Sequence, residues 1–191
     1  MVPKKILVKN MEADKGDIRR AVLRVRDGLE REERERASLL LTERILGHQW
    51  FYGSTYFLGF ASYGSEIDTW EILREALRLG KKVYVPKVIR DDVLRMEFYR
   101  IGGPEDLQEG YKGIWEPSGS GEEYIYTERI AEHTLMLMPG VAFDGYRNRI
   151  GYGKGFYDRF LADKEGLRMR TVAVGYRCQM VDEVPVSESD V

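Results

Sequence analysis

From Ser54 onward the chain alternates between short β-prone runs and amphipathic helices, and this alternation constrains the fold most strongly. Runs rich in β-branched, aromatic or long apolar residues occupy 54–62, 82–86, 135–139 and 170–176. Between them, Thr69 is expected to cap a helix that Gly80 ends, and another helix is expected to begin near Lys154. Strand, helix, strand order predicts an α/β fold with three layers, in which helices cover both faces of a mostly parallel sheet. Ligands then bind at the carboxyl ends of the strands.

An N-terminal helical arm precedes the sheet. Asp14 is expected to cap a first helix that Gly28 ends, and a second helix is predicted over 30–46. The alternating segment 94–101 predicts a half-exposed strand added antiparallel to the sheet. The segment 102–121 is so rich in Gly and Pro that no regular element is expected there. Because no linker or repeat divides the 191 residues, we expect one domain over 1–191.

Composition excludes several classes of protein. The net charge of -2 disfavours a strongly basic nucleic-acid binder, and no apolar run is long enough to span a membrane. Cys178 has no partner for an internal disulfide and, with only His48 and His133, cannot complete a zinc site. A reducing, cytoplasmic setting is therefore expected. The scarcity of histidine favours chemistry based on carboxylates, lysine, arginine and a bound metal or nucleotide.

The densest chemical signal is the segment 139–158, PGVAFDGYRNRIGYGKGFYD. It follows a predicted buried strand and leads into a helix, where closely spaced glycines allow backbone N–H groups to approach an anion. Gly155 after Lys154 distinguishes it from a Walker A loop, which has Ser or Thr there. The residues alone leave open a glycine-rich turn with solvated arginines. They also leave open whether Asp158 binds a metal or only stabilises the helix N-terminus.

The runs PGVAFD and RIGYGKGFYDRFL resemble the signature of the 5-formyltetrahydrofolate cyclo-ligase family, also called 5,10-methenyltetrahydrofolate synthetase. Other features of that family match in order along the chain: Lys15, Arg19, and the segments 64–69, 85–86, 113–117 and 184–190. The resemblance implies a cytoplasmic ATP- and Mg2+-dependent ligase of one-carbon metabolism. It would convert 5-formyltetrahydrofolate to 5,10-methenyltetrahydrofolate and release ADP and phosphate. The expected partners are these two substrates, with no nucleic acid or membrane, and the expected state is a monomer or weak homodimer.

The resemblance also implies roles for individual residues. Lys154 and Arg149 would act in catalysis, Glu66 and Tyr152 would bind the folate, and Asp158 and Asp190 would bind Mg2+. The nucleotide-binding residues would be Lys15, Arg19, Arg149, Ile150, Gly151, Tyr152, Gly153, Lys154, Gly155, Phe156 and Tyr157. From the residues alone, a solvated helix face is the favoured interpretation of Lys15 and Arg19, and support of the next helix N-terminus stays open as the role of Glu66.

Three departures from the family pattern are notable. Phe156 stands where a second tyrosine is common, residues 1–12 precede the matched region, and the pattern usually continues beyond Asp190. We therefore expect the chain to be slightly short at its C-terminal end. Two other functions stay open: a catalytically weak folate- or nucleotide-binding protein of the same fold, and a sugar-phosphate isomerase or lactonase that uses Glu66 as a base.

Overall fold

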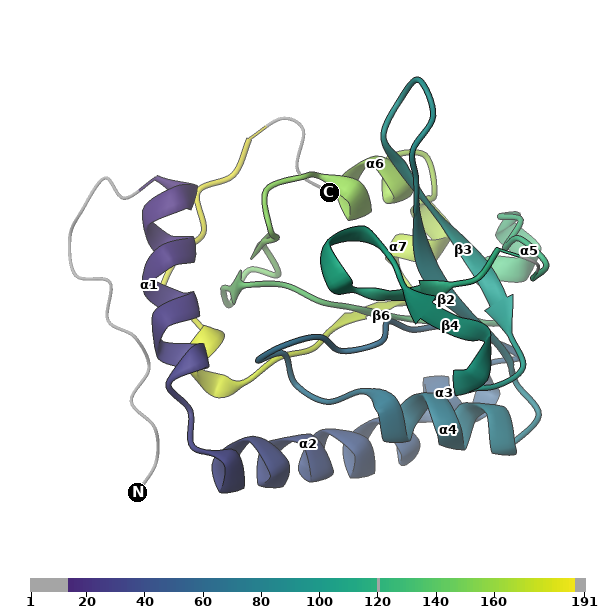
Figure 1. The fold of residues 1–191 in the computed structure, drawn as a ribbon, viewed down its shortest axis with the longest axis horizontal. Coiled ribbons are helices and arrows are strands. Elements are labelled where there is room, and N and C mark those ends of the chain that lie inside the picture. Colours follow the sequence, from purple (N-terminus) through teal and green to yellow (C-terminus); the bar gives the residue numbers. More distant parts are fainter. Residues whose placement is uncertain (1–13, 120, 188–191) are drawn as a thin grey trace.

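The computed structural model describes residues 14–119 and 121–187. A five-stranded sheet with the order β3-β2-β1-β6-β9 forms its centre (Figure 1). Its strands are β1 (Tyr56–Leu58), β2 (Lys82–Ile89), β3 (Arg95–Ile101), β6 (Thr134–Met138) and β9 (Thr171–Ala173). The pairs β1–β2, β1–β6 and β6–β9 are parallel, whereas β3 runs antiparallel to β2 at one edge. The predicted mostly parallel sheet and its antiparallel addition are thus confirmed.

Helices cover both faces of the sheet (Figure 1). One face carries α2 (Arg31–Leu46), α3 (Gln49–Gly53) and α4 (Trp70–Arg78), and the other carries α5 (Glu128–Ala131), α6 (Phe156–Leu161) and α7 (Glu165–Arg168). Because successive side chains of a strand point to opposite faces, Leu135 and Leu137 of β6 join the first core cluster, and Met136 and Met138 join the second. Within the described residues, no helix combines the length and apolarity needed to cross a membrane.

The first helix, α1 (Lys15–Asp27), stands at the left of the molecule in Figure 1, beside the C-terminal segment. Asp14 caps it by accepting a hydrogen bond from Asp17 N (2.8 Å), and Gly28 follows its last residue, as predicted. Ile18 and Val22 of α1 pack against a small hairpin formed by β7 (Ala142–Phe143) and β8 (Arg149–Ile150). The first helix of the N-terminal arm, α1, therefore packs directly on the glycine-rich segment 139–158.

Thr69 does not cap α4 as predicted. It occupies the N-cap position, but its hydroxyl donates to the carbonyl oxygen of Phe60 (2.6 Å). The carboxylate of Asp68 accepts from Trp70 N (2.8 Å) in its place. Since Thr69 is almost fully buried, its hydroxyl satisfies a buried backbone carbonyl, and the neighbouring carboxylate satisfies the helix N-terminus.

The expectation that 102–121 lacks regular elements is also wrong. Strands β4 (Leu107–Glu109) and β5 (Trp115–Pro117) pair antiparallel, with one single helical turn, η1 (Pro104–Asp106), before β4 and another, η2 (Tyr111–Gly113), between the two strands. We call the segment 107–117 the flap. The glycines that suggested irregular backbone instead serve its turns: Gly113 has φ +79°, in the left-handed region that glycine adopts without strain.

Candidate active site

A cavity of about 920 Å3 lies at the carboxyl ends of β1, β2 and β6. Phe60 and Ala61 follow β1, Pro86 belongs to β2, and Pro139 follows β6, and all four line the cavity. The remaining walls come from α1, the flap and the glycine-rich segment. This is the edge of the sheet where the sequence predicts ligand binding, and the volume lies within the range of small-molecule sites.

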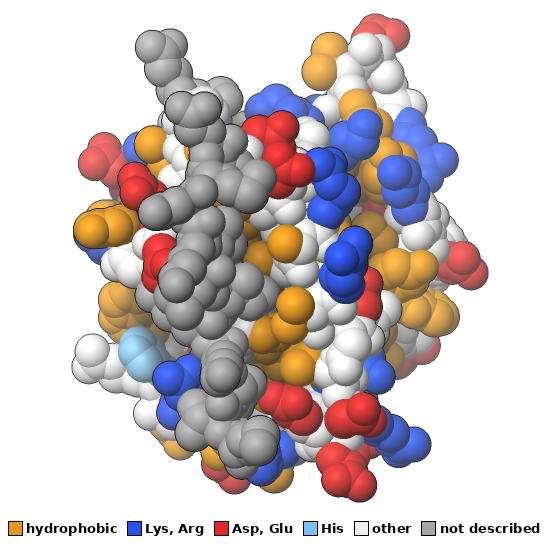
Figure 2. Space-filling model, turned by 90° about the vertical axis from the view of Figure 1, so that its left-hand side faces the viewer, with side chains coloured by type: hydrophobic (Ala, Val, Ile, Leu, Met, Phe, Trp, Pro, Cys, Tyr) orange, Lys and Arg blue, Asp and Glu red, His pale blue; other side chains and the backbone are white. Residues whose placement is uncertain are grey.

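The residues that line the cavity carry more positive charge than the chain as a whole. The described lining residues include seven cations, namely Lys15, Arg19, Arg26, Lys112, Arg149, Lys154 and Arg159. They include four carboxylates, namely Asp27, Glu66, Glu116 and Asp158. Figure 2, which views the side of the molecule that carries α1, shows Lys and Arg side chains gathered on its right-hand half. Although the whole chain has a net charge of -2, this cavity thus favours anionic ligands.

The glycine-rich segment forms a tight loop between β8 and α6. Gly153 has φ +87° and Gly155 φ +60°, values at which a side chain would be strained. An added Cβ at Gly153 would also lie about 3.5 Å from the Arg19 guanidinium. α6 begins at Phe156, two residues later than expected, because the left-handed backbone of Gly155 cannot belong to an α-helix. Lys154 therefore projects from the loop and not from the helix.

Asp144 holds the turn between β7 and β8 through hydrogen bonds. Its buried carboxylate accepts hydrogen bonds from the backbone N–H groups of Tyr146 (2.9 Å), Asn148 (2.9 Å) and Val184 (3.0 Å), and from Asn148 Nδ2 (2.9 Å). Burial opposes ionisation, but these four hydrogen bonds lower the pKa of Asp144 below its usual value. The ionised carboxylate thereby joins the turn between β7 and β8 to the C-terminal segment.

Two arginines hold opposite ends of the loop. Arg19 of α1 donates from Nε to the carbonyl oxygen of Gly151 (2.8 Å). Arg149, whose side chain is only 7% exposed, pairs through Nη2 with Asp158 Oδ1 (2.7 Å). The Nε atom of Arg149 is buried and has no hydrogen-bond partner within the described structure. A buried donor without a partner is costly, and a phosphate oxygen in the adjoining cavity would satisfy it.

Lys154 and Lys15 differ in their surroundings. Lys154 is exposed, lines the cavity and has no hydrogen bond or ion pair with the described part of the chain. Lys15 donates from Nζ to Ser187 Oγ (3.1 Å), which ties the start of α1 to the C-terminal segment. Lys154 thus retains the freedom to contact a ligand as a point charge.

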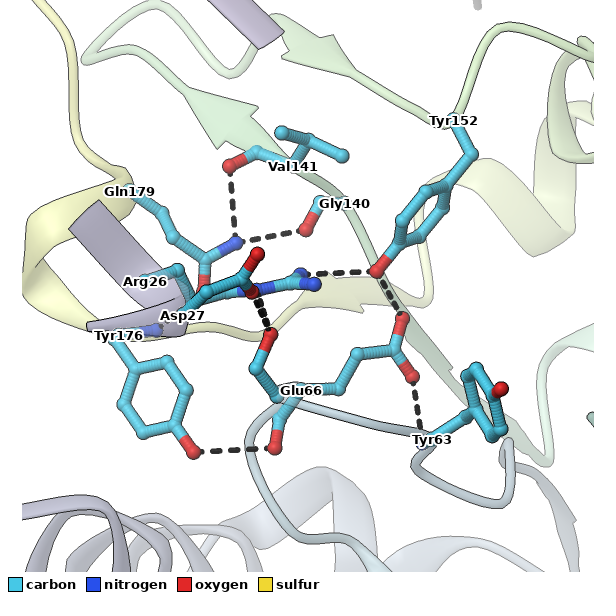
Figure 3. A network of polar contacts seen from close by, with 10 residues as sticks. Arg26, Asp27, Tyr63, Glu66, Gly140, Val141, Tyr152, Tyr176 and Gln179 are labelled. Atoms are coloured by element: carbon cyan, nitrogen blue, oxygen red, sulfur yellow. Dashed lines mark hydrogen bonds and ion pairs between the residues drawn. The ribbon is translucent and has the colours of Figure 1, made fainter. Parts of the chain in front are cut away.

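A polar network surrounds Glu66 and includes Tyr152 of the loop (Figure 3). The Tyr152 hydroxyl donates to Glu66 Oε1 (2.7 Å), and Glu66 Oε2 accepts from Tyr63 N (3.0 Å). The same Tyr152 hydroxyl accepts from Arg26 Nη1 (2.9 Å). Burial and the nearby Glu66 carboxylate raise the pKa of Tyr152 above its usual value, so its hydroxyl keeps its proton at neutral pH.

The flap closes the side of the cavity opposite α1. Tyr111 packs edge-on against Phe156 with 6.1 Å between ring centroids, so the ring that remains in place of a second tyrosine has a packing role. Glu116 is buried and accepts from Val88 N (3.2 Å), which fastens the flap to β2. The segment 113–117 matches the family pattern in the sequence, but the sequence does not predict its place in the wall of the cavity.

The structure brings nearly all of the predicted site residues together. Lys15, Arg19, Glu66 and the whole run 149–158 line the same cavity, although 132 positions separate Arg19 from Gly151. Asp190 lies outside the described residues. Arg26 was missed, yet the sequence contains a signal for it: it continues the spacing of four that places Ile18 and Val22 in the core, and a charged residue in an apolar stripe requires buried partners.

Carboxylates in the lining of the cavity are the candidates for the predicted Mg2+ site. Over residues 14–119 and 121–187, no group of three or more His, Cys, Asp and Glu side chains could hold a metal by itself. Asp158 lines the cavity with its side chain 23% exposed. Because Mg2+ commonly binds through one or two carboxylates together with phosphate oxygens, Asp158 fits a magnesium ion shared with a bound phosphate.

Comparison with known proteins agrees with this geometry. The model of the 5-formyltetrahydrofolate cyclo-ligase family matches residues 11–191. The 5-formyltetrahydrofolate cyclo-ligase of Mus musculus is 30% identical over 167 residues, which cover 85% of this chain and 82% of that protein. The solved structure of Aquifex aeolicus 5,10-methenyltetrahydrofolate synthetase superposes with a TM-score of 0.77 and 31% identity, covering 93% of this chain and 85% of that one. The protein thus shares its fold and sequence features with these relatives, and the chain belongs to the 5-formyltetrahydrofolate cyclo-ligase family.

Proposed function

We propose that this protein converts 5-formyltetrahydrofolate to 5,10-methenyltetrahydrofolate at the cavity, with MgATP as co-substrate and ADP and phosphate as the other products. Membership of the cyclo-ligase family supports the overall reaction. The observation that carries the ATP requirement is the buried Nε of Arg149, which has no partner within the described structure and lies beside a cationic, glycine-rich loop. An oxygen of a nucleotide phosphate would satisfy this donor and pair with the charge of the guanidinium.

The chemistry needs activation of an amide oxygen. The formyl group on N5 is an amide, and oxide or hydroxide would be a poor leaving group from its carbon. Transfer of the γ-phosphoryl group of ATP to the formyl oxygen releases ADP and turns that oxygen into part of a good leaving group. N10 of the folate then attacks the activated carbon and gives up its proton, the C–O bond breaks, and phosphate departs to leave the cyclic methenyl product.

The residues around the loop suit the phosphoryl-transfer step. Lys154 has the freedom and charge to follow the transferring phosphoryl group, and Arg149 would hold phosphate oxygens through Nε while Asp158 keeps its guanidinium in place. Arg19 fixes the loop that carries Gly151 and so would position the nucleotide indirectly. Bound Mg2+, held by Asp158 and phosphate oxygens, would neutralise charge on the phosphates.

The folate would occupy the part of the cavity beside Glu66 and Tyr152. Both oxygens of Glu66 are oriented by hydrogen bonds, from Tyr152 and from Tyr63 N, and each retains a lone pair for a ligand N–H group. The pterin ring of the folate carries such donors. Binding the folate beside Tyr152 and the phosphates beside Lys154 of the same loop would bring the formyl oxygen near the γ-phosphate.

The proposal is tested by mixing the protein with MgATP and 5-formyltetrahydrofolate and following the absorbance of the methenyl product, with ADP measured in parallel. We expect one ADP for each methenyl product and no product without ATP. Product formed without ATP would contradict the phosphoryl-transfer route. Binding of both ligands in calorimetry without any turnover would instead identify a catalytically weak folate- or nucleotide-binding protein.

The role of Asp158 is tested by the dependence of the rate on Mg2+ concentration. In Asp158→Asn we expect half-maximal activity to require roughly tenfold more Mg2+, because an amide oxygen is a weaker ligand than a carboxylate. Asp163→Asn is the matched control, since Asp163 is 81% exposed and pairs with Lys164. An unchanged Mg2+ dependence in Asp158→Asn would leave Asp158 only its ion pair with Arg149.

A further inference from the structure

Arg26 is a deeply buried cation that has no part in the phosphoryl transfer proposed above. It lies in the last turn of α1 and is only 4% exposed. Its Nε donates to Ser65 Oγ (2.9 Å), and its Nη1 donates to the Tyr152 hydroxyl (2.9 Å). Ser65 in turn donates to Asp27, the nearest carboxylate to Arg26 at 3.9 Å. Figure 3 shows this guanidinium pointing from the helix toward the phenol and Glu66.

The donor and acceptor capacities fix the direction of these hydrogen bonds. A guanidinium can only donate, so Arg26 occupies a lone pair of the Tyr152 oxygen. The phenolic proton must then go to another acceptor, and Glu66 Oε1 lies 2.7 Å away. The hydrogen bonds therefore run from Arg26 through Tyr152 to Glu66. A donor of formal charge +1 at the start of such a chain strengthens the next hydrogen bond along it.

We propose that Arg26 is a positioning residue for the folate: it acts through the Tyr152 hydroxyl to hold the Glu66 carboxylate in one orientation. This inference rests on the proposed function, since it assumes that the folate binds beside Glu66. Tyr152 is half exposed on a glycine-rich loop, where its ring would otherwise be free to change rotamer. The Arg26 guanidinium also lies 5.7 Å from the centroid of the Tyr152 ring, and this cation–π contact fixes the ring as well as the hydroxyl.

A positioning role and a purely structural role predict different measurements. If Arg26 only stabilised the packing of α1, its replacement would lower the melting temperature and reduce the amount of active enzyme without changing either KM. If it positions Glu66, its replacement raises the KM for 5-formyltetrahydrofolate more than the KM for ATP, because the hydrogen-bond chain from Arg26 ends at Glu66 whereas the proposed phosphate contacts are made by Arg149 and Lys154.

The experiment is a double-mutant cycle of Arg26→Met and Tyr152→Phe with steady-state kinetics for both substrates. Methionine keeps an unbranched apolar side chain but cannot donate a hydrogen bond. We expect Arg26→Met to raise the KM for the folate about tenfold, and to raise it less than about twofold in the Tyr152→Phe background, because the link to Glu66 is already absent there. Arg24→Met, an exposed arginine of the same helix outside the cavity lining, is the matched control and should leave both KM values unchanged.

Several outcomes would overturn the proposal: effects that add fully in the double variant, an equal rise in the KM for ATP, or a fall in melting temperature with an unchanged folate KM. If Arg26→Met does not fold, Arg26→Lys keeps the charge but loses the fork that reaches both Ser65 and Tyr152, and it should also raise the folate KM. Failure of the proposed function looks different, since wild-type protein would then form no methenyl product. In that case calorimetric binding of the folate to wild type, Arg26→Met and Arg24→Met still decides the positioning role.

Discussion

Lys154 and Arg149 bring the same charge into the cavity but are held in different ways. Arg149 is buried, paired with Asp158 and stacked 5.6 Å from the Tyr157 ring centroid, whereas Lys154 extends from a loop with no described partner. A rigid planar cation suits the binding of a phosphate in a fixed place, and a flexible point charge suits a phosphoryl group that moves between two oxygens. The two residues are therefore expected to respond differently to substitution.

Lys154→Ala should reduce kcat about 100-fold, the usual effect of removing one donor to a developing charge, while the melting temperature stays unchanged because no described contact is lost. The measurement is the rate of methenyl formation together with thermal unfolding. Arg147→Gln is a suitable control, because Arg147 is exposed in the same segment but does not line the cavity. Equal losses of activity and melting temperature in Lys154→Ala would show that Lys154 supports the loop and not the reaction.

Asp144 gives a prediction about pH. Its pKa in the folded state lies below the ordinary value of 3.8, so the ionised carboxylate stabilises the fold above about pH 4, and this contribution is lost as the pH falls through the folded pKa. Asp144→Asn should cost about 2–4 kcal/mol in the free energy of unfolding at pH 7, because the amide cannot accept all four hydrogen bonds. Urea unfolding should show a smaller difference from wild type at pH 3. A difference independent of pH would contradict this account.

At the scale of elements, the loop before α6 shows how a local backbone requirement sets the position of a functional group. Gly155 at φ +60° ends the loop and fixes the start of the helix at Phe156. This leaves Lys154 outside the helix, and it places Asp158 in the first turn, where the helix dipole favours a carboxylate. The sequence predicted the helix and the place of Asp158 but not the two-residue shift of its start.

Gly155→Ala should therefore destabilise the protein by about 1–2 kcal/mol, the cost of a left-handed conformation for an L-residue. We also expect a loss of activity larger than the loss of folded protein, since the loop carries Lys154 and Gly153. The control is Gly145→Ala in the same segment: Gly145 does not have positive φ, and an added Cβ would meet nothing within 4 Å. Thermal unfolding and activity are measured for both variants, and equal effects would exclude backbone strain as the cause.

At the scale of the whole molecule, the proposed function requires one cavity to bind two ligands. Each ligand should stabilise the folded state by linkage, about 2.7 kcal/mol at a concentration 100 times its Kd, or about 5–10 °C in melting temperature for a chain of this size. Lys154→Ala should reduce the shift caused by MgATP and keep that caused by 5-formyltetrahydrofolate, and Glu66→Gln should do the reverse. Thermal unfolding with each ligand measures the four shifts. Loss of both shifts in either variant would contradict two separate subsites.

The sheet and the glycine-rich loop of this protein could be predicted from the sequence, because both depend on residues close together in the chain. Buried parallel strands and amphipathic helices have their own periodicities, and the glycines of 149–158 lie within one short segment. The tertiary structure alone decided which distant groups meet. It placed Arg26 against Tyr152 across 126 positions, joined Asp144 to Val184, and folded the flap, residues 107–117, into the wall of the cavity. Such contacts follow from the packing of buried charges and backbone groups that need partners, and local propensity does not encode where those partners lie.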